Sequence, residues 1–173
     1  AAAVAATGMP LIVAALGKLG GEELNVSSDV DLVFLYDDDP QQIEGYAAAG
    51  RKVIALLSEI TAEGAAFRVD MRLRPFGDSG RVAMGFSAFE NYMQQHGRDW
   101  ERYAYVKARC ITAQEEYPAL YDQVLRPFVY RRYLDFGVFE SLRDMKALIA
   151  REVERRELQD NVKLGPGGIR EIE

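Results

Sequence analysis

Two aspartates, Asp29 and Asp31, are separated by one residue and open an apolar run, 32–36. Residues i and i+2 of a β-strand point to the same face, so the two carboxylates would emerge side by side. Like charges held that close repel each other unless a cation lies between them, and hard oxygen ligands favour Mg²⁺ or Mn²⁺. A glycine-rich turn containing Gly20 and Gly21 comes shortly before them. The pattern predicts a site for phosphoryl chemistry.

The glycine turn matches neither of the common phosphate-binding motifs. Lys18 is followed by leucine rather than by serine or threonine, and the G-x-G-x-x-G spacing is missing. A tight strand-to-helix turn therefore explains Gly20 and Gly21 as well as phosphate binding does. Ser27 and Ser28 directly precede the first aspartate, and their hydroxyl groups could hold phosphate oxygens while the carboxylates hold a bridging metal.

The aspartate pair also allows a simpler interpretation, because an isolated Asp-x-Asp can cap a turn or face solvent at a strand end. Aspartate is unfavourable in strands, however, and the rest of this strand is apolar. Asp70 lies in the next expected strand, on a polar face that it shares with Arg68, Arg72 and Arg74. Three carboxylates on neighbouring strands could bind two divalent cations suited to in-line phosphoryl transfer. The arginines could neutralise Asp70 or bind substrate phosphates bidentately.

Apolar periodicity predicts the elements that would position these side chains. Residues 11–16 and 29–36 are typical of buried strands, and 67–74 alternates between apolar and charged residues as a third strand does. Helices are expected over residues 41–62, 87–95, 99–112, 118–130 and 138–157. The sequence thus predicts an α+β fold, in which a small mixed β-sheet with helices (1–85) is followed by a mostly helical region (86–173).

Composition limits the classes of function. The net charge of −6 argues against nucleic acid as a partner. A single cysteine, Cys110, excludes an internal disulfide and is typical of a reducing cytosol. No apolar run reaches the roughly 18 residues needed to cross a bilayer, so we expect a cytoplasmic location without membrane contact. The sequence lacks an initiator methionine, and we interpret it as a piece of a longer polypeptide.

Gly-Gly, then Ser-Asp-x-Asp, then a later strand aspartate resembles the pattern of polymerase-beta-type nucleotidyltransferases. More narrowly, the sequence resembles the bifunctional glutamine synthetase adenylyltransferase/adenylyl-removing enzymes, and the similarity runs from about residue 8 to the end. It is carried by residues 17–32, 69–77 and 97–102. That family has two related catalytic halves. The segments that resemble its N-terminal, adenylyl-removing half are residues 72–77, 100–103, 106–109 and 164–173.

The resemblance implies a polymerase-beta-like nucleotidyltransferase fold and a reaction, which is phosphorolysis of an adenylylated tyrosine on glutamine synthetase to release ADP. Inorganic phosphate and ADP or ATP would be the small ligands, and Mg²⁺ or Mn²⁺ the cofactor. Asp29, Asp31 and Asp70 would bind the metal and carry catalysis. The groups that would contact substrate or phosphate are Gly20, Gly21, Ser27, Ser28, Arg72, Arg74, Lys107 and Arg109.

Several alternatives stay open at this point. The domain could instead be the adenylylating half, which transfers AMP from ATP to a tyrosine, or a regulatory module with a vestigial nucleotide site. A PII-type nitrogen-signalling protein is a further partner that the resemblance implies. Trp100, the single tryptophan, is expected as a core anchor of the helical region, with adenine stacking as the other interpretation. Glu171 and Glu173 could approach the metal site.

Overall fold

The computed structural model describes residues 1–26, 28–39, 41–62, 64–112, 117–130, 136–158, 161–162 and 165–168. Contacts between residues divide the chain into two compact units, Ala1–Arg132 and Tyr133–Glu173. Gly85, where the sequence predicted a division, lies inside the first unit. The sheet and all three aspartates belong to that unit.

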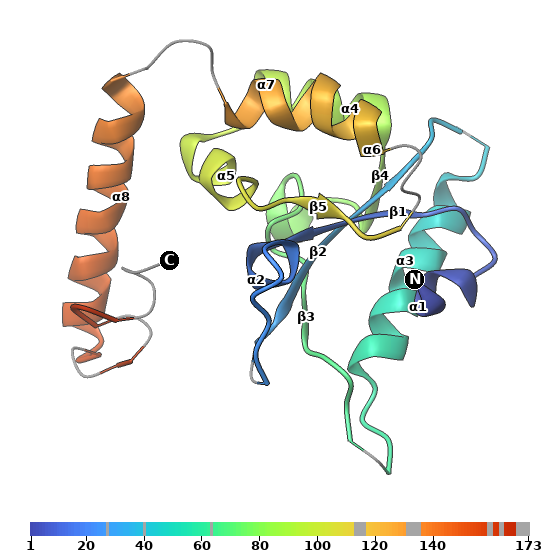
Figure 1. The fold of residues 1–173 in the computed structure, drawn as a ribbon, viewed down its shortest axis with the longest axis horizontal. Coiled ribbons are helices and arrows are strands. Elements are labelled where there is room, and N and C mark those ends of the chain that lie inside the picture. Colours follow the sequence, from blue (N-terminus) through green and yellow to red (C-terminus); the bar gives the residue numbers. More distant parts are fainter. Residues whose placement is uncertain are drawn as a thin grey trace. The chain divides into compact units, whose positions relative to one another are not determined.

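The first unit is built on a five-stranded sheet of order β3-β2-β1-β5, in which β4 also pairs with β2 (Figure 1). Strand β1 is antiparallel to both β2 and β5, whereas β3 and β4 are parallel to β2. The mixed sheet confirms the predicted α+β class. The strands are β1 (Ile12–Leu16), β2 (Val30–Tyr36), β3 (Val69–Asp70), β4 (Ala83–Gly85) and β5 (Arg109–Cys110).

Strands β3 and β4 share one edge of β2, because β1 occupies the other edge along residues 31–35. Strand β3 pairs with residues 30–31 of β2, and β4 pairs with residues 34–36. The intervening residues, 71–82, leave the sheet as a loop. This interruption places a polar loop beside the start of β2, where the aspartates lie.

Helices cover both faces of the sheet, so β1 and β2 are buried on both sides as their apolar sequences predicted (Figure 1). On one face, Val13, Leu32 and Phe34 pack with α3. On the other, Leu16 and Val33 belong to a cluster that includes side chains of α4 and of the segment before α7. The helices are α1 (Ala2–Ala5), α2 (Gly17–Gly20), α3 (Ile43–Ser58), a 3-10 turn (Gly77–Ser79), α4 (Phe86–Gln95), α5 (Asp99–Ala104), α6 (Tyr117–Ala119), a π-helical segment (Leu120–Leu125) and α7 (Arg126–Val129).

The strand predicted over 67–74 is confirmed only at Val69 and Asp70, which form β3, and the rest of the prediction is wrong. The Asp70 carboxylate accepts a hydrogen bond from the backbone N–H of Arg72 at 2.8 Å, which turns the chain away from the sheet. The Arg74 guanidinium then binds the Met71 carbonyl at 2.7 Å. These local side-chain bonds outcompete the strand ladder that the alternating pattern favoured.

The helix predicted over 99–112 is also wrong in its second half, because α5 ends at Ala104. Arg109 and Cys110 instead pair with Ala15 and Ala14, and so cover the open edge of β1. The other predicted helices are confirmed, and most of their observed ends differ from the predicted ones by a few residues.

The second unit contains one long helix, α8 (Phe136–Arg155). Near its C-terminal end, the exposed Glu152 carboxylate accepts hydrogen bonds from Arg155 and Arg156, which lower its pKa to about 2. Among the described residues, none of the helices combines the length and the apolar character needed to span a bilayer.

Candidate active site

Two of the three aspartates pair directly across the sheet. Asp31 of β2 lies opposite Asp70 of β3 in the parallel register, and residues paired in this way project to the same face. Asp29 lies one residue before β2, and its Oδ1 accepts a hydrogen bond from Nε of Arg68 at 2.6 Å. The sequence predicted Asp29 beside Asp31 and Asp70 on a neighbouring strand, and the register places Asp70 opposite Asp31.

Asp29, Asp31 and Asp70 together form the acidic edge of the sheet, and arginine side chains neutralise part of its charge. Nη2 of Arg72 donates to Oδ2 of Asp70 at 2.5 Å, and Nε donates to the same oxygen at 2.9 Å. The hydrogen bonds from the Arg72 side chain are the main reason that the pKa of Asp70 falls below its ordinary value, and partial burial opposes them. Because the folded pKa is lowered, this carboxylate stabilises the fold above its ordinary pKa, and the stabilisation is lost as the pH falls through the folded pKa.

The acidic edge has the donor chemistry of a magnesium site. An open cavity of about 490 Å³ is lined by Asp29, Asp70, Arg68, Arg72 and Asp78. Within the described ranges, the structure gathers no group of three histidine, cysteine or acidic side chains in a geometry that could hold a metal ion. Mg²⁺ is usually bound through one or two carboxylates, with water and substrate phosphates as the remaining ligands. Asp31 and Asp70 could supply two such carboxylates. Asp78 is a further carboxylate that the sequence interpretation missed.

Gly17 is a second residue that the sequence interpretation missed. It starts α2 with φ of +53°, and a Cβ placed on it would lie 2.7 Å from Oδ2 of Asp31. Glycine therefore lets the backbone turn tightly against the Asp31 carboxylate. The residue stands within the glycine-rich turn, but its role depends on a contact that sequence spacing does not reveal.

Four of the residues predicted to bind phosphate meet at the other end of α2. The Arg109 guanidinium donates to the carbonyls of Gly20 and Leu19 at 3.2 and 3.3 Å. A Cβ on Gly20 would lie 2.2 Å from the Lys107 carbonyl oxygen, and one on Gly21 would lie 2.9 Å from Cδ of Lys107. The structure thus brings these residues together as a brace that holds the glycine turn against the strand β5.

The serines before Asp29 are only partly described. Oγ of Ser28 donates to Oδ1 of Asn25 at 2.6 Å and accepts from the Asn25 backbone N–H at 3.2 Å, so it closes the loop that leads into β2. Ser27, Glu171 and Glu173 lie outside the described residues.

Arg74 has a different environment from Arg72, although both were predicted to contact phosphate. The Arg72 side chain is 74% exposed, whereas that of Arg74 is 12% exposed. The Arg74 guanidinium binds the carbonyls of Met71, Asp78 and Gly80 at 2.7, 3.1 and 3.3 Å. It therefore ties together the loop 71–82, and of these two arginines it is Arg72 that faces solvent beside the aspartates.

We expect Arg74→Met to lower the free energy of unfolding by about 2 kcal/mol, because it leaves three carbonyl groups of the loop without their charged donor. Urea denaturation followed by circular dichroism measures the change. Arg81→Met is the matched control, since Arg81 is an exposed residue of the same loop, and we expect it to change stability by less than about 0.5 kcal/mol. Equal losses for both variants would contradict the bracing role of Arg74.

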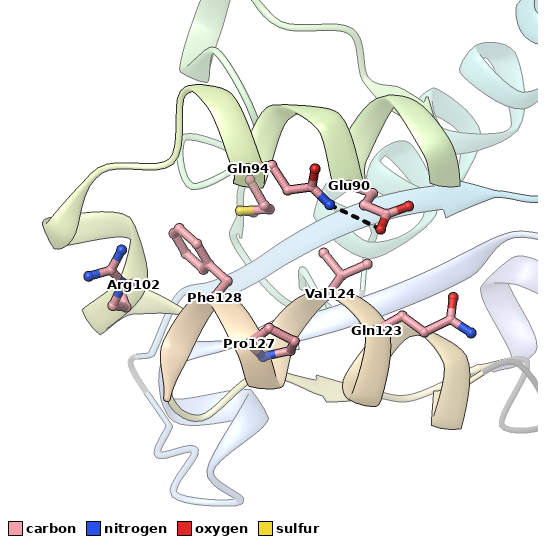
Figure 2. Close-up of a pocket in the computed structure, with 8 residues that line it drawn as sticks. Glu90, Gln94, Arg102, Gln123, Val124, Pro127 and Phe128 are labelled. Atoms are coloured by element: carbon pink, nitrogen blue, oxygen red, sulfur yellow. Dashed lines mark hydrogen bonds between the residues drawn. The ribbon is translucent and has the colours of Figure 1, made fainter. Parts of the chain in front are cut away.

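A smaller cavity of about 210 Å³ lies between α4 and the segment leading into α7, on the helical side of the unit (Figure 2). Nε2 of Gln94 donates to Oε1 of Glu90 at 3.1 Å along its rim, and the Arg102 guanidinium lies 5.2 Å from the centre of the Phe128 ring. None of the three aspartates lines it. We do not assign the phosphoryl chemistry to this cavity.

Comparison with known proteins identifies the family of this chain. A family profile described as "Glutamate-ammonia ligase adenylyltransferase" matches residues 2–124, which include every strand and all three aspartates. Adenylyltransferases are nucleotidyltransferases, the class that the pattern of Gly-Gly, Ser-Asp-x-Asp and a later strand aspartate resembles. The chain belongs to the glutamate-ammonia ligase adenylyltransferase family.

Curated relatives support this assignment over nearly the whole chain. The "Bifunctional glutamine synthetase adenylyltransferase/adenylyl-removing enzyme" of Idiomarina loihiensis is 52% identical over 174 residues, and that of Shewanella oneidensis is 51% identical over 173 residues. Each comparison covers 95% of this chain but only 18% of the relative. A second profile, described as "GlnD PII-uridylyltransferase", matches residues 143–173 in the second unit.

Proposed function

We propose that this domain removes the adenylyl group from a modified tyrosine of glutamine synthetase by phosphorolysis. The observation that carries the proposal is the pairing of Asp31 with Asp70 at a sheet edge that also presents Arg72. Two relatives about half identical to the chain have names that state both adenylyl transfer and adenylyl removal on glutamine synthetase. The choice of the removing half rests on the motifs of residues 72–77, 100–103, 106–109 and 164–173, which resemble that half.

In the proposed reaction, an oxygen of hydrogen phosphate attacks the adenylyl phosphorus and the bond from phosphorus to the tyrosine oxygen breaks. The products are ADP and a tyrosine hydroxyl, which takes up the proton that hydrogen phosphate brought. Asp31 and Asp70, with Asp29 beside them, would hold a Mg²⁺ or Mn²⁺ ion, whose charge neutralises phosphate oxygens. Inorganic phosphate is already an anion and needs no general base. The protein's part is therefore to position the two phosphorus groups.

Arg72 is the residue best placed to bind the attacking phosphate. Its side chain is exposed and lines the acidic cavity, and its guanidinium donates hydrogen bonds to Asp70. A guanidinium can bind a phosphate bidentately. When phosphate and metal are present, Arg72 would exchange its carboxylate partner for phosphate oxygens while staying at the same edge.

Product analysis tests the proposal. We expect the chain, supplied with adenylylated glutamine synthetase, inorganic phosphate and Mg²⁺ or Mn²⁺, to release ADP in amounts equal to the adenylyl-tyrosine lost. Omitting phosphate should abolish the release. Incorporation of AMP from ATP into unmodified glutamine synthetase, without any ADP release from the modified form, would show the adenylylating half instead. Neither reaction under either condition would favour a regulatory module.

A further inference from the structure

A second, larger cavity adjoins the acidic edge. It measures about 620 Å³ and lies among the loop 71–82, the end of α4 and the start of α5. Arg72 lines both this cavity and the acidic one, so the two cavities adjoin at that side chain. A ligand whose phosphate lies at Arg72 therefore has space beside it for a further group. The volume is within the range of small-molecule sites.

Aromatic side chains form part of its wall. Phe76 and Trp100 both line the cavity, and they are 53% and 39% exposed. The sequence expected Trp100 as a core anchor, but this exposure leaves part of the indole accessible. Exposed aromatic rings in a concave site are suited to stacking on a planar ligand.

Phe76 is held in an uncommon backbone conformation. Its φ of +62° lies in the left-handed region, which residues other than glycine seldom adopt. The Oγ of Ser79 donates to the Phe76 carbonyl at 2.8 Å, and the Phe76 ring packs edge-on against Tyr92 with centroids 4.6 Å apart. The fold thus accepts backbone strain while presenting this ring at the cavity. Strain of this kind is concentrated at functional sites.

The rest of the wall combines positively charged side chains with a hydrogen-bonded junction between α4 and α5. Arg72 and Arg98 line the cavity with His96 and the buried Glu101, and the two guanidinium groups favour an anionic ligand. Below them, the buried Glu101 carboxylate accepts hydrogen bonds from the Tyr92 hydroxyl at 2.6 Å and from the Arg98 backbone N–H at 2.9 Å. These bonds fix the junction of α4 and α5, and with it the positions from which Arg98 and His96 extend.

We propose that this cavity binds the adenosine part of the nucleotide, with the base in contact with both Phe76 and Trp100 and the phosphates directed through Arg72 toward Asp31 and Asp70. The inference rests on the proposed function, because that function requires an adenine nucleotide at the acidic edge. It adds two specificity-determining aromatic residues that lie outside the carboxylate site. Phosphate-only ligands would reach Arg72 but would not contact these rings.

The single tryptophan provides a direct readout. We expect ADP to quench Trp100 fluorescence saturably in the 173-residue chain with Mg²⁺, while pyrophosphate binds without comparable quenching. By calorimetry, Phe76→Ala and Trp100→Ala should each weaken ADP binding about 10-fold, as loss of a stacking partner does, and leave pyrophosphate affinity unchanged. Trp100→Phe should restore most of the affinity. Tyr103→Ala is the control, since Tyr103 is an exposed aromatic of α5 that does not line the cavity.

Unchanged ADP affinity in both alanine variants, or equal quenching by pyrophosphate and ADP, would overturn the inference. If an alanine variant fails to fold, the quenching of the unaltered chain and the affinity of Trp100→Phe still decide. Failure of the proposed function can be distinguished from failure of this inference. A chain that binds ADP through Phe76 and Trp100 but releases no ADP from adenylylated glutamine synthetase keeps the nucleoside site and loses the reaction. If ADP is released but the two alanine substitutions do not weaken ADP binding, the reaction is kept and the nucleoside site is lost.

Discussion

Replacing both Asp31 and Asp70 by asparagine is expected to lower the rate of ADP release from adenylylated glutamine synthetase by about 10³-fold or more. Asp31 and Asp70 are opposite each other in the register of β2 and β3, so the change removes both charges that would hold the metal while keeping side-chain size. Initial rates at saturating phosphate measure the loss. Isothermal titration with Mn²⁺ should show a parallel loss of metal binding.

Asp122→Asn is the matched control for this double variant. Asp122 is an exposed residue of the same unit, and its carboxylate lies 3.7 Å from the Arg126 guanidinium, a surface pair of little energetic weight. We expect it to keep the full rate. Retention of substantial activity by Asp31→Asn with Asp70→Asn, in a variant that melts at the normal temperature, would refute a catalytic role for the acidic edge.

Gly20→Ala is expected to lower the free energy of unfolding by about 3 kcal/mol, because overpacking a tight contact forces the backbone to move. The added Cβ would lie 2.2 Å from the Lys107 carbonyl oxygen and 2.6 Å from that of Ala15. Both neighbours are backbone atoms of the sheet region and cannot rotate away. Urea denaturation measures the loss, and the site should lose activity with the fold because α2 starts at the Asp31 carboxylate.

Gly45→Ala makes the same chemical change at a position with space for it. Gly45 lies in α3, and its added Cβ would approach only the flexible Met9 side chain, at 3.4 Å. Alanine is the better helix former by about 1 kcal/mol, so we expect no loss of stability. If the two variants were equally stable, the close approach of Lys107 to the glycine turn would not be a structural requirement.

Sequence patterning predicted the parts of the fold that depend on apolar burial. Residues 11–16 and 32–36 are apolar on both faces, and they lie in the central strands β1 and β2, buried by helices on both sides. Helices with a clear apolar stripe, such as α3 and α4, also follow the prediction. In these segments, local preference and tertiary burial favour the same structure.

Prediction failed where polar side chains decide the backbone path. The alternation of 67–74 is that of a strand, yet Asp70 binds the N–H of Arg72 and ends β3 after two residues. Arg109 was placed on a helix because the signal that makes it a strand is the open edge of β1, which lies far away in sequence. The pairing of Asp31 with Asp70 likewise depends on the order of the strands in the sheet, which hydrophobic periodicity does not reveal.

The pairing of β5 with β1 has a consequence for the growing polypeptide. β1 lies near the start of the first unit, but its outer partner, and the Lys107 and Arg109 groups that brace α2, come much later in the chain. A nascent chain halted before residue 107 would already carry all three aspartates and yet lack the contacts that fix the glycine turn beside them. Contacts of such long sequence separation form slowly, and the glycine turn can be fixed beside the aspartates only after the ribosome has released residues 107–110.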